Sequence, residues 1–197
     1  MTKIILASNN QNKVAEVKEI LKDKNVEIVS LKEAGIDVDV EENGTTFEEN
    51  ALIKARAVCK MTGSVTMADD SGLEVDYLDK QPGVYSARFI GHDTSYDIKN
   101  KAIIDKLEGV EGDARSARFV AAIAVVFPDG KEIVTRGTME GLIAREPAGD
   151  NGFGYDPIVY LPEYGMTSAQ LSPEEKNKIS HRGKALKKMA EELKGIL

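Results

Sequence analysis

The run Lys3-Ile4-Ile5-Leu6-Ala7-Ser8-Asn9-Asn10-Gln11-Asn12-Lys13 decides the fold class, because a short apolar segment passes through a polar turn into a helix. Residues 3–7 predict a buried strand, and residues 26–31 predict a second one. Residues 12–24 predict an amphipathic helix, since apolar residues recur on one helical face: Val14, Val17, Ile20 and Leu21. The order strand, turn, helix and strand favours an α/β fold.

The rest of the chain alternates predicted helices and strands. Thr46 and Glu49 form a capping-box pattern at the start of a helix over residues 46–62, and Gly63 suits its end. Strands are expected at 65–68 and 73–77, separated by an acidic turn. A hairpin is expected around Pro128-Asp129-Gly130. Further elements are a loop over 80–93, a helix over 95–107, hairpin strands over 117–127 and 132–144, a short strand over 158–160, a helix after Ser172 and a last helix after Gly183.

Composition restricts the class of protein. The chain has 33 acidic and 26 basic residues and a net charge of -7, which disfavours a nucleic-acid polymer or an anionic membrane as partner. The longest apolar run, 119–127, is too short to span a bilayer, and the N-terminal stretch is too short for a secretory signal. The single cysteine, Cys59, excludes an internal disulfide and a cysteine-based zinc site. We therefore expect one soluble cytoplasmic α/β unit over residues 1–197.

The stretch Ala68-Asp69-Asp70-Ser71-Gly72-Leu73 is the strongest candidate site. Adjacent carboxylates repel each other, so they need a metal ion, a cation or water nearby. Asp69 and Asp70 are suitable ligands for Mg²⁺, and such a carboxylate can also deprotonate an attacking water. The alternative is an aspartate-rich turn whose side chains cap its own backbone.

Two lysines could bind phosphate. The turn from Ser8 to Asn12 directs backbone N–H groups toward a possible anion, and Lys13 adds a positive charge. The alternative there is a solvated helix start. Lys54 lies beside an apolar stripe, where it needs a carboxylate or phosphate partner, unless its ammonium simply reaches water.

The glycine-flanked Phe153 could stack on a purine base. Asp156 could accept hydrogen bonds from the base, and Arg182 could donate to a purine carbonyl or a phosphate. The alternative is an aromatic anchor in a mobile loop. Together these residues fit a Mg²⁺–nucleotide better than a peptide or a lipid.

Taken in order, several blocks resemble the inosine triphosphate pyrophosphatase family of purine nucleoside triphosphatases. These blocks are residues 8–13, 41–51 (Glu-Glu-Asn-Gly-Thr-Thr-Phe-Glu-Glu-Asn-Ala), 54–55, 68–73, 82–88 (Pro-Gly-Val-Tyr-Ser-Ala-Arg), 153–157 (Phe-Gly-Tyr-Asp-Pro) and 180–183 (Ser-His-Arg-Gly). One departure is Asn9, which stands where the family usually has glycine. Asparagine also tolerates left-handed backbone geometry, so we expect the turn to be kept.

The resemblance implies a long twisted mixed sheet flanked by helices, two lobes with a central nucleotide cleft, and a homodimer. It also implies Mg²⁺-dependent cleavage of dITP, ITP and XTP to the monophosphate and pyrophosphate. Asp70 and Lys54 would be the catalytic residues, with Asp70 as the general base. Asp70 and Glu41 would hold the metal, with Glu42 as the less favoured candidate. It also implies the residues that bind the triphosphate, namely Ser8, Asn9, Asn10, Gln11, Asn12, Lys13, Lys54 and Lys176. Ser71 would contact the substrate. The base pocket would consist of Phe153, Gly154, Tyr155, Asp156, His181 and Arg182.

Two other functions stay open at this point. A pyrophosphatase for modified pyrimidine or ordinary deoxynucleotides would use the same residues. A nucleotide sensor would bind without turnover, although it would have no need of a general base.

Overall fold

The computed structural model describes residues 1–197, which form one seven-stranded mixed sheet with the strand order β2-β1-β3-β4-β5-β6-β7. β1 pairs in parallel with β2 and β3, whereas β6 pairs in antiparallel fashion with β5 and β7. The expected α/β class, with a mixed sheet flanked by helices, is confirmed. The strands are β1 (Thr2–Leu6), β2 (Val26–Ser30), β3 (Thr66–Val75), β4 (Ser116–Val126), β5 (Glu132–Ile143), β6 (Val159–Leu161) and β7 (Met166–Thr167).

The five α-helices follow the predicted ones to within a few residues. They are α1 (Gln11–Leu21), α2 (Phe47–Thr62), α3 (Tyr96–Lys106), α4 (Pro173–Ile179) and α5 (His181–Leu193). The predicted capping box of Thr46 and Glu49 is present, and Gly63 ends α2 with a left-handed φ of 65°. α5 begins three residues earlier than expected, which brings His181 and Arg182 into its first turn.

The predicted acidic turn is wrong. Asp69 and Asp70 lie inside β3, which continues without a break from Thr66 to Val75. Both aspartates are buried. The strand can continue through them because lysine and arginine side chains from neighbouring elements neutralise the charge, as described below.

The chain divides into two compact units, here called the first unit and the second unit. The first unit comprises residues 1–70, 121–137 and 181–197, and the second comprises residues 71–120 and 138–180. β3, β4 and β5 each contribute residues to both units. Each unit has a hydrophobic core of its own.

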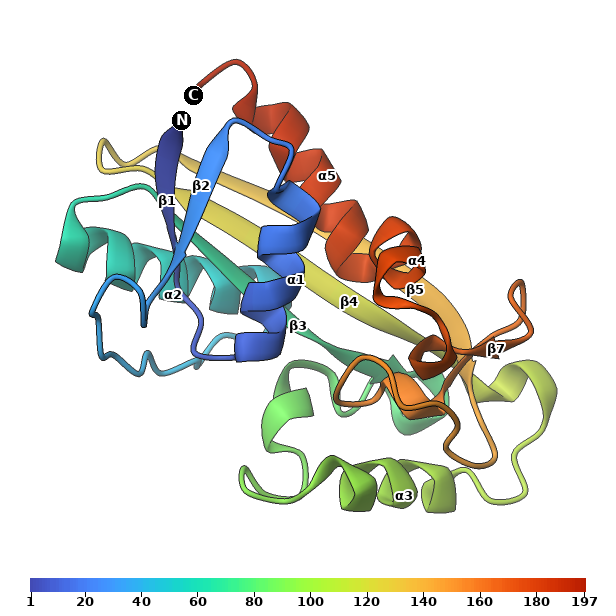
Figure 1. Ribbon diagram of the computed structural model, residues 1–197. Helices are drawn as coiled ribbons and strands as arrows, with labels where there is room; N and C mark the ends of the chain where they lie inside the picture. Colours follow the sequence, from blue (N-terminus) through green and yellow to red (C-terminus); the bar gives the residue numbers. More distant parts are fainter. The chain divides into compact units, whose positions relative to one another are not determined.

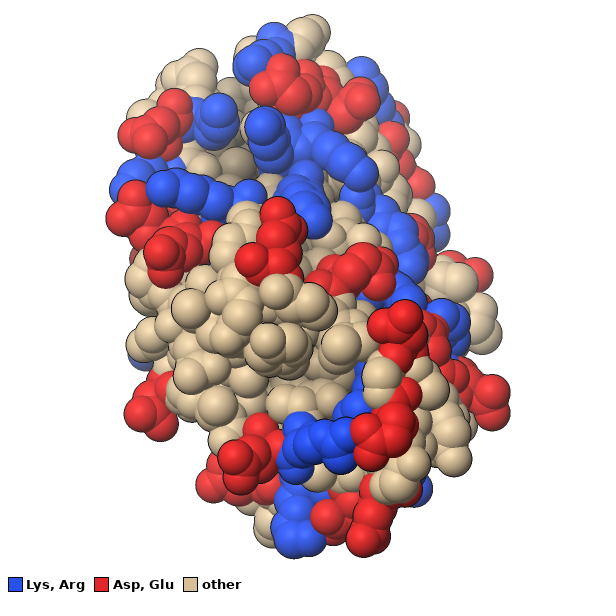
Figure 2. All heavy atoms as spheres, turned by 90° about the vertical axis from the view of Figure 1, so that its right-hand side faces the viewer, with Lys and Arg blue, Asp and Glu red and all other residues tan.

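In the first unit, helices cover both faces of the strands. Figure 1 shows α1 and α5 in front of the strands of this unit, with α2 behind them. α1 contributes Val14, Val17 and Leu21 to the core, and α5 contributes mainly Leu186 and Met189. The exposed residues of α5 are charged, and Figure 2, viewed from the side of α5, shows basic and acidic side chains interspersed. Amphipathic helices on a buried sheet explain the helical spacing seen in the sequence.

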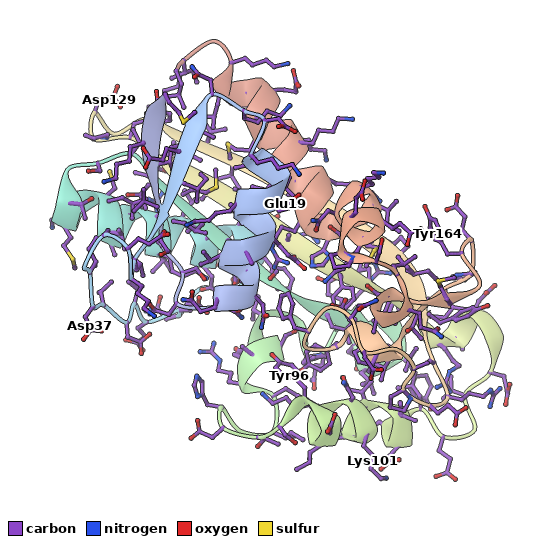
Figure 3. The ribbon with its side chains drawn as sticks, viewed as in Figure 1. Glu19, Asp37, Tyr96, Lys101, Asp129 and Tyr164 are labelled. Atoms are coloured by element: carbon purple, nitrogen blue, oxygen red, sulfur yellow. The ribbon has the colours of Figure 1, made fainter.

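The ends of the first unit's strands are joined by exposed connections. Asp37 marks the connection between β2 and α2, and Asp129 marks the tip of the predicted β4–β5 hairpin (Figure 3). No helix has the length and apolar character needed to cross a bilayer.

The second unit packs α3 against the strands through a core that includes Ile103 and Leu107. The C-terminal end of α3 is held by Arg115, whose buried guanidinium donates to the carbonyl oxygens of Leu107, Val110, Ile143 and Ala144 over 2.7–3.0 Å. Burial lowers the pKa of Arg115. One cation therefore satisfies backbone acceptors from α3, from the loop that follows it and from β5.

Replacing Arg115 with Met should destabilise the protein by about 3 kcal/mol, because several buried carbonyl groups lose their donor. Urea unfolding followed by circular dichroism measures this change. Lys106→Met, at an exposed position on α3, is the control and should change stability by less than about 0.5 kcal/mol. Equal effects of the two substitutions would contradict the role given to Arg115.

Candidate active site

Seven charged side chains gather in the first unit, and we call them the charged cluster. They come from α1, the loop before α2, α2 itself, β3 and α5. The cluster consists of Lys13, Glu16, Glu42, Lys54, Asp69, Asp70 and Arg182. Four of its residues were predicted for catalysis or metal binding: Lys54, Asp69, Asp70 and, as the less favoured metal candidate, Glu42. Two, Lys13 and Arg182, were predicted for substrate binding.

Asp69 is the centre of one half of the charged cluster. Its Oδ1 lies 2.8 Å from the ammonium of Lys13, and its Oδ2 accepts a 2.8 Å hydrogen bond from Nε of Arg182. Burial alone would raise the pKa of Asp69, but Arg182 and Lys13 more than offset it and hold the pKa well below its usual range. Asp69 is therefore an anion whose two oxygens are both occupied by protein cations.

Arg182 is fixed in this half from two sides. Its side chain is 1% exposed, and Nη1 donates to Glu16 on α1 over 2.5 Å. The backbone at the start of α5 lies against Gly137 of β5, where an added Cβ would overlap the carbonyl oxygen of His181. Only glycine allows this close approach, which positions His181 and Arg182 over the strand.

Asp70 and Lys54 form the other half. Nζ of Lys54 lies 2.5 Å from Glu42, 2.7 Å from the backbone carbonyl of Asp69 and 3.6 Å from Oδ1 of Asp70. Oδ2 of Asp70 is buried and has no hydrogen-bond partner. The open alternative of a lysine reaching into water is therefore wrong, since Lys54 has carboxylate partners.

The two aspartates differ in their protonation behaviour. Burial raises the pKa of Asp70, and the nearby lysines Lys54 and Lys13 only partly offset it. Burial lowers the pKa of Lys54, but Asp70 and Glu42 more than compensate and raise it. Asp70 thus combines an unpartnered oxygen with a raised pKa, which suits a proton acceptor near a reaction centre.

The residues present could hold a magnesium ion, although no group of three metal-binding side chains gathers anywhere in the chain. The unpartnered Oδ2 of Asp70 is a suitable hard ligand. Glu42 is engaged by Lys54, whereas the neighbouring Glu41 is exposed. Mg²⁺ commonly takes one or two protein carboxylates and completes its coordination with phosphate oxygens and waters. Two carboxylates, those of Asp70 and Glu41, are therefore sufficient for this ion.

The predicted phosphate-binding turn is capped by its own side chains. Asn10 is the N-cap of α1, and its Oδ1 accepts from the N–H groups of Asn12 and Lys13 over 3.0 and 3.2 Å. The Asn9 amide donates to the carbonyl of Val38 over 3.1 Å, and the Ser8 hydroxyl accepts from the N–H of Asn10. The turn therefore has an ordered shape, and the Lys13 side chain, paired with Asp69, is 15% exposed.

In the second unit, four residues form what we call the Phe153 cluster: Phe153, Asp156, Ser168 and Lys176. Asp156 is buried, and its carboxylate accepts from the N–H of Phe153 at 2.9 Å, from Ser168 at 2.8 Å and from Lys176 at 2.7 Å. The ammonium of Lys176 lies 4.9 Å from the centre of the Phe153 ring. Asp156 thus holds the loop and Lys176, in addition to any contact with a base.

The structure distributes the predicted substrate residues between the two units. His181 and Arg182 belong to the first unit with the turn Ser8–Lys13, whereas Ser71, Phe153–Asp156 and Lys176 belong to the second. Lys176, predicted to bind the triphosphate, lies in the Phe153 cluster.

Sequence reasoning missed Glu16 and Ser168. Glu16 could have been found, because it lies three residues after Lys13 on the same face of α1. Ser168 offered no signal of that kind.

Asp69 should make stability depend on pH. Its pKa is lower in the folded than in the unfolded state, so its contribution is complete above the usual pKa near 4 and is lost progressively as the pH falls from there toward the folded-state pKa. The wild-type protein, measured in EDTA, should therefore lose stability between about pH 5 and 3 more steeply than Asp69→Asn. Urea unfolding at each pH checks this, and parallel curves would contradict the ion-pair assignment.

The comparisons with known proteins are consistent along the whole chain. The model of the Ham1 family matches residues 4–192. A dITP/XTP pyrophosphatase of Clostridium perfringens is 51% identical, with 100% of both chains covered, and one of Desulforamulus reducens is 50% identical over 96% of this chain and 94% of that protein.

Solved structures agree with the sequence relatives. A HAM1 protein from Coxiella burnetii superposes with a TM-score of 0.89 and 43% identity, covering 99% of this chain and 100% of that one. The Staphylococcus aureus Ham1 protein gives a TM-score of 0.88 at 43% identity, covering 98% and 99%. Because the family model matches residues 4–192 and relatives at about 50% identity span nearly the whole chain, this chain belongs to the Ham1 family.

Proposed function

We propose that this protein hydrolyses non-standard purine nucleoside triphosphates, namely dITP, ITP and XTP, to the monophosphate and pyrophosphate, and so removes them from the nucleotide pool. The observation that carries the proposal is the contrast between the adjacent aspartates. Asp69 is saturated by cations, while Asp70 keeps one buried oxygen unpartnered and has a raised pKa. The names of the relatives at about 50% identity support the same activity.

In this proposal Asp70 accepts the proton of the attacking water. The water oxygen forms a bond to the α-phosphorus, the bond from that phosphorus to the bridging oxygen breaks, and pyrophosphate leaves. Lys13 and Lys54 would stabilise the negative charge on the phosphates. Carboxylates of the charged cluster hold both ammonium groups in fixed positions for this task. Asp69 holds Lys13 in place for this task.

Asp70 and Glu41 would hold Mg²⁺. When bound, the ion would neutralise phosphate charge and orient the leaving group. Asp70 would then have two tasks on one carboxylate. Its two oxygens allow this, because Oδ2 has no protein partner and Oδ1, 3.6 Å from Nζ of Lys54, is not within hydrogen-bond distance of it.

The Phe153 cluster would recognise the base. The ring of Phe153 would stack on the purine, and Lys176, held against that ring by Asp156, would donate to the 6-oxo group. An ammonium group can only donate, so it matches the carbonyl of hypoxanthine or xanthine and is mismatched with the amino group of adenine. In this proposal Lys176 therefore acts on the base, whereas the sequence had suggested the triphosphate.

Three further proposals rest on the family resemblance. The catalytic unit is the whole of residues 1–197, the protein acts as a homodimer, and it works in the cytoplasm. Sedimentation equilibrium of the purified chain tests the dimer. The expected mass is twice that of the chain, and a mass near 21.5 kDa would indicate a monomer.

The experiment that tests the function is a substrate panel. Purified protein with Mg²⁺ is incubated with dITP, XTP, dATP, dGTP and dTTP, and phosphate and pyrophosphate are measured separately. We expect pyrophosphate from dITP and XTP and little from the others. Orthophosphate or indiscriminate cleavage would overturn the proposed activity, and tight binding without any product would indicate a nucleotide sensor.

Asp70→Asn should reduce kcat for ITP by about 10²–10⁴-fold, because the amide cannot accept the proton of water. Binding of ITP measured without Mg²⁺ should change by less than about threefold, since the side chain keeps its size and Lys13 stays paired with Asp69. Initial rates and calorimetric binding of ITP measure the two quantities.

The matched control is Asp129→Asn, which removes a carboxylate at the exposed hairpin tip and should leave kcat unchanged. Near-normal turnover of Asp70→Asn would remove Asp70 from the role of general base. A circular dichroism spectrum identical to that of the wild type is required of both variants.

A further inference from the structure

The loop that carries Phe153 is held from two sides within the second unit. On one side Asp156 accepts the N–H of Phe153 over 2.9 Å. On the other side Nδ2 of Asn100, on α3, donates to the carbonyl oxygen of Gly154 over 3.1 Å. The two hydrogen bonds bracket the dipeptide Phe153-Gly154 and so restrict the backbone angles that aim the Phe153 ring.

A buried asparagine at position 100 is unfavourable for stability. It is 2% exposed, and its Oδ1 is buried without a hydrogen-bond partner. A buried polar oxygen left unpaired costs free energy, and an apolar side chain of similar size would avoid that cost. The stability of α3 therefore does not explain the amide, whereas its bond to Gly154 does.

The first turn of α3 supplies a second contact with the same loop. The Tyr96 ring lies at the start of α3 (Figure 3) and packs edge-on against Tyr155, with the ring centres 5.2 Å apart. Gly154 has a left-handed φ of 65°, and a Cβ added there would be 3.5 Å from Tyr96. Tyr155 is tied down in turn, since its hydroxyl donates to the carbonyl of Ser86 over 2.6 Å.

We propose that Asn100 is a positioning residue for base recognition: it fixes the Gly154 peptide and thereby the direction of the Phe153 ring. This inference rests on the proposed function, because it assigns Asn100 to the base-binding part of that site. In this proposal Asn100 acts through the Gly154 peptide and not by contact with the substrate. Its loss should therefore weaken base selectivity and leave the binding of phosphate groups unchanged.

The test compares Asn100→Leu with the wild type on ITP, on ATP and on inorganic tripolyphosphate, which lacks a base. The variant should raise KM for ITP by about tenfold and lower the ratio of kcat/KM for ITP to that for ATP by about tenfold, the size expected for one lost hydrogen bond that orients a ligand. Inhibition by tripolyphosphate should stay within about twofold of the wild type.

The matched control is Ile103→Ala, which loosens the same helix by removing a buried apolar side chain of the second unit's core. It should lower the melting temperature without changing the ratio of kcat/KM for ITP to that for ATP. A loss of selectivity equal to that of Asn100→Leu would reduce Asn100 to a merely structural role. Weaker tripolyphosphate inhibition in Asn100→Leu, in parallel with KM, would overturn the proposal.

Hydrogen exchange of the free protein gives a readout that is independent of activity. Asn100→Leu should speed exchange of the Phe153 and Tyr155 amides by about tenfold, whereas Ile103→Ala should affect α3 and spare this loop. If Asn100→Leu does not fold, Asn100→Asp takes its place, because a carboxylate keeps the shape but repels the Gly154 carbonyl. Unchanged hydrogen exchange of the Phe153 and Tyr155 amides in the folded variant would refute the positioning role of Asn100. A wild type inactive on ITP would refute the proposed function alone.

Discussion

A carboxylate with no exposed surface, that of Asp69, lies in the middle of a strand, and the first unit can contain it only because Lys13 and Arg182 face it. Its pairing joins α1, β3 and α5, and Glu16 closes the network on the far side of Arg182. Removing one partner would leave a buried charge unpaired, which costs about 3–5 kcal/mol. The position of the Lys13 ammonium, in the first turn of α1, follows from this one interaction.

Asp69 and Asp70 differ in their partners, since both oxygens of Asp69 are paired with cations whereas Oδ2 of Asp70 has no partner. Adjacent residues of a strand point to opposite faces, so the two carboxylates meet different surroundings although they share a peptide bond. One face offers Lys13 and Arg182, and the other offers Lys54 with its partner Glu42. A pair of acids that looks redundant in the sequence is thus divided into a structural anion and a reactive group.

Local patterns predicted most of the fold. The helix of residues 47–62, for example, could be read from its capping box, its apolar face and Gly63. The continuity of β3 could not be read, because two aspartates end a strand unless cations from distant segments reach them, and Arg182 lies 113 residues away. The Asn100 contact escaped for the same reason, since its partner Gly154 is 54 residues along the chain. The site was predictable as a set of residue types, but its pairings were not.

The long separation between Asp69 and Arg182 has a consequence for biosynthesis. A ribosome adds about 5–20 residues per second, so Arg182 is added roughly 6–20 s after Asp69. During that interval the nascent chain has no guanidinium for Asp69 and no α5 to cover the apolar face of β1, β3 and β4. The Asp69 carboxylate of β3 therefore stays hydrated or bound to other partners until the segment from His181 onward has been synthesised. Completion of the first unit is therefore a late event in synthesis, although its first strand is made at the outset.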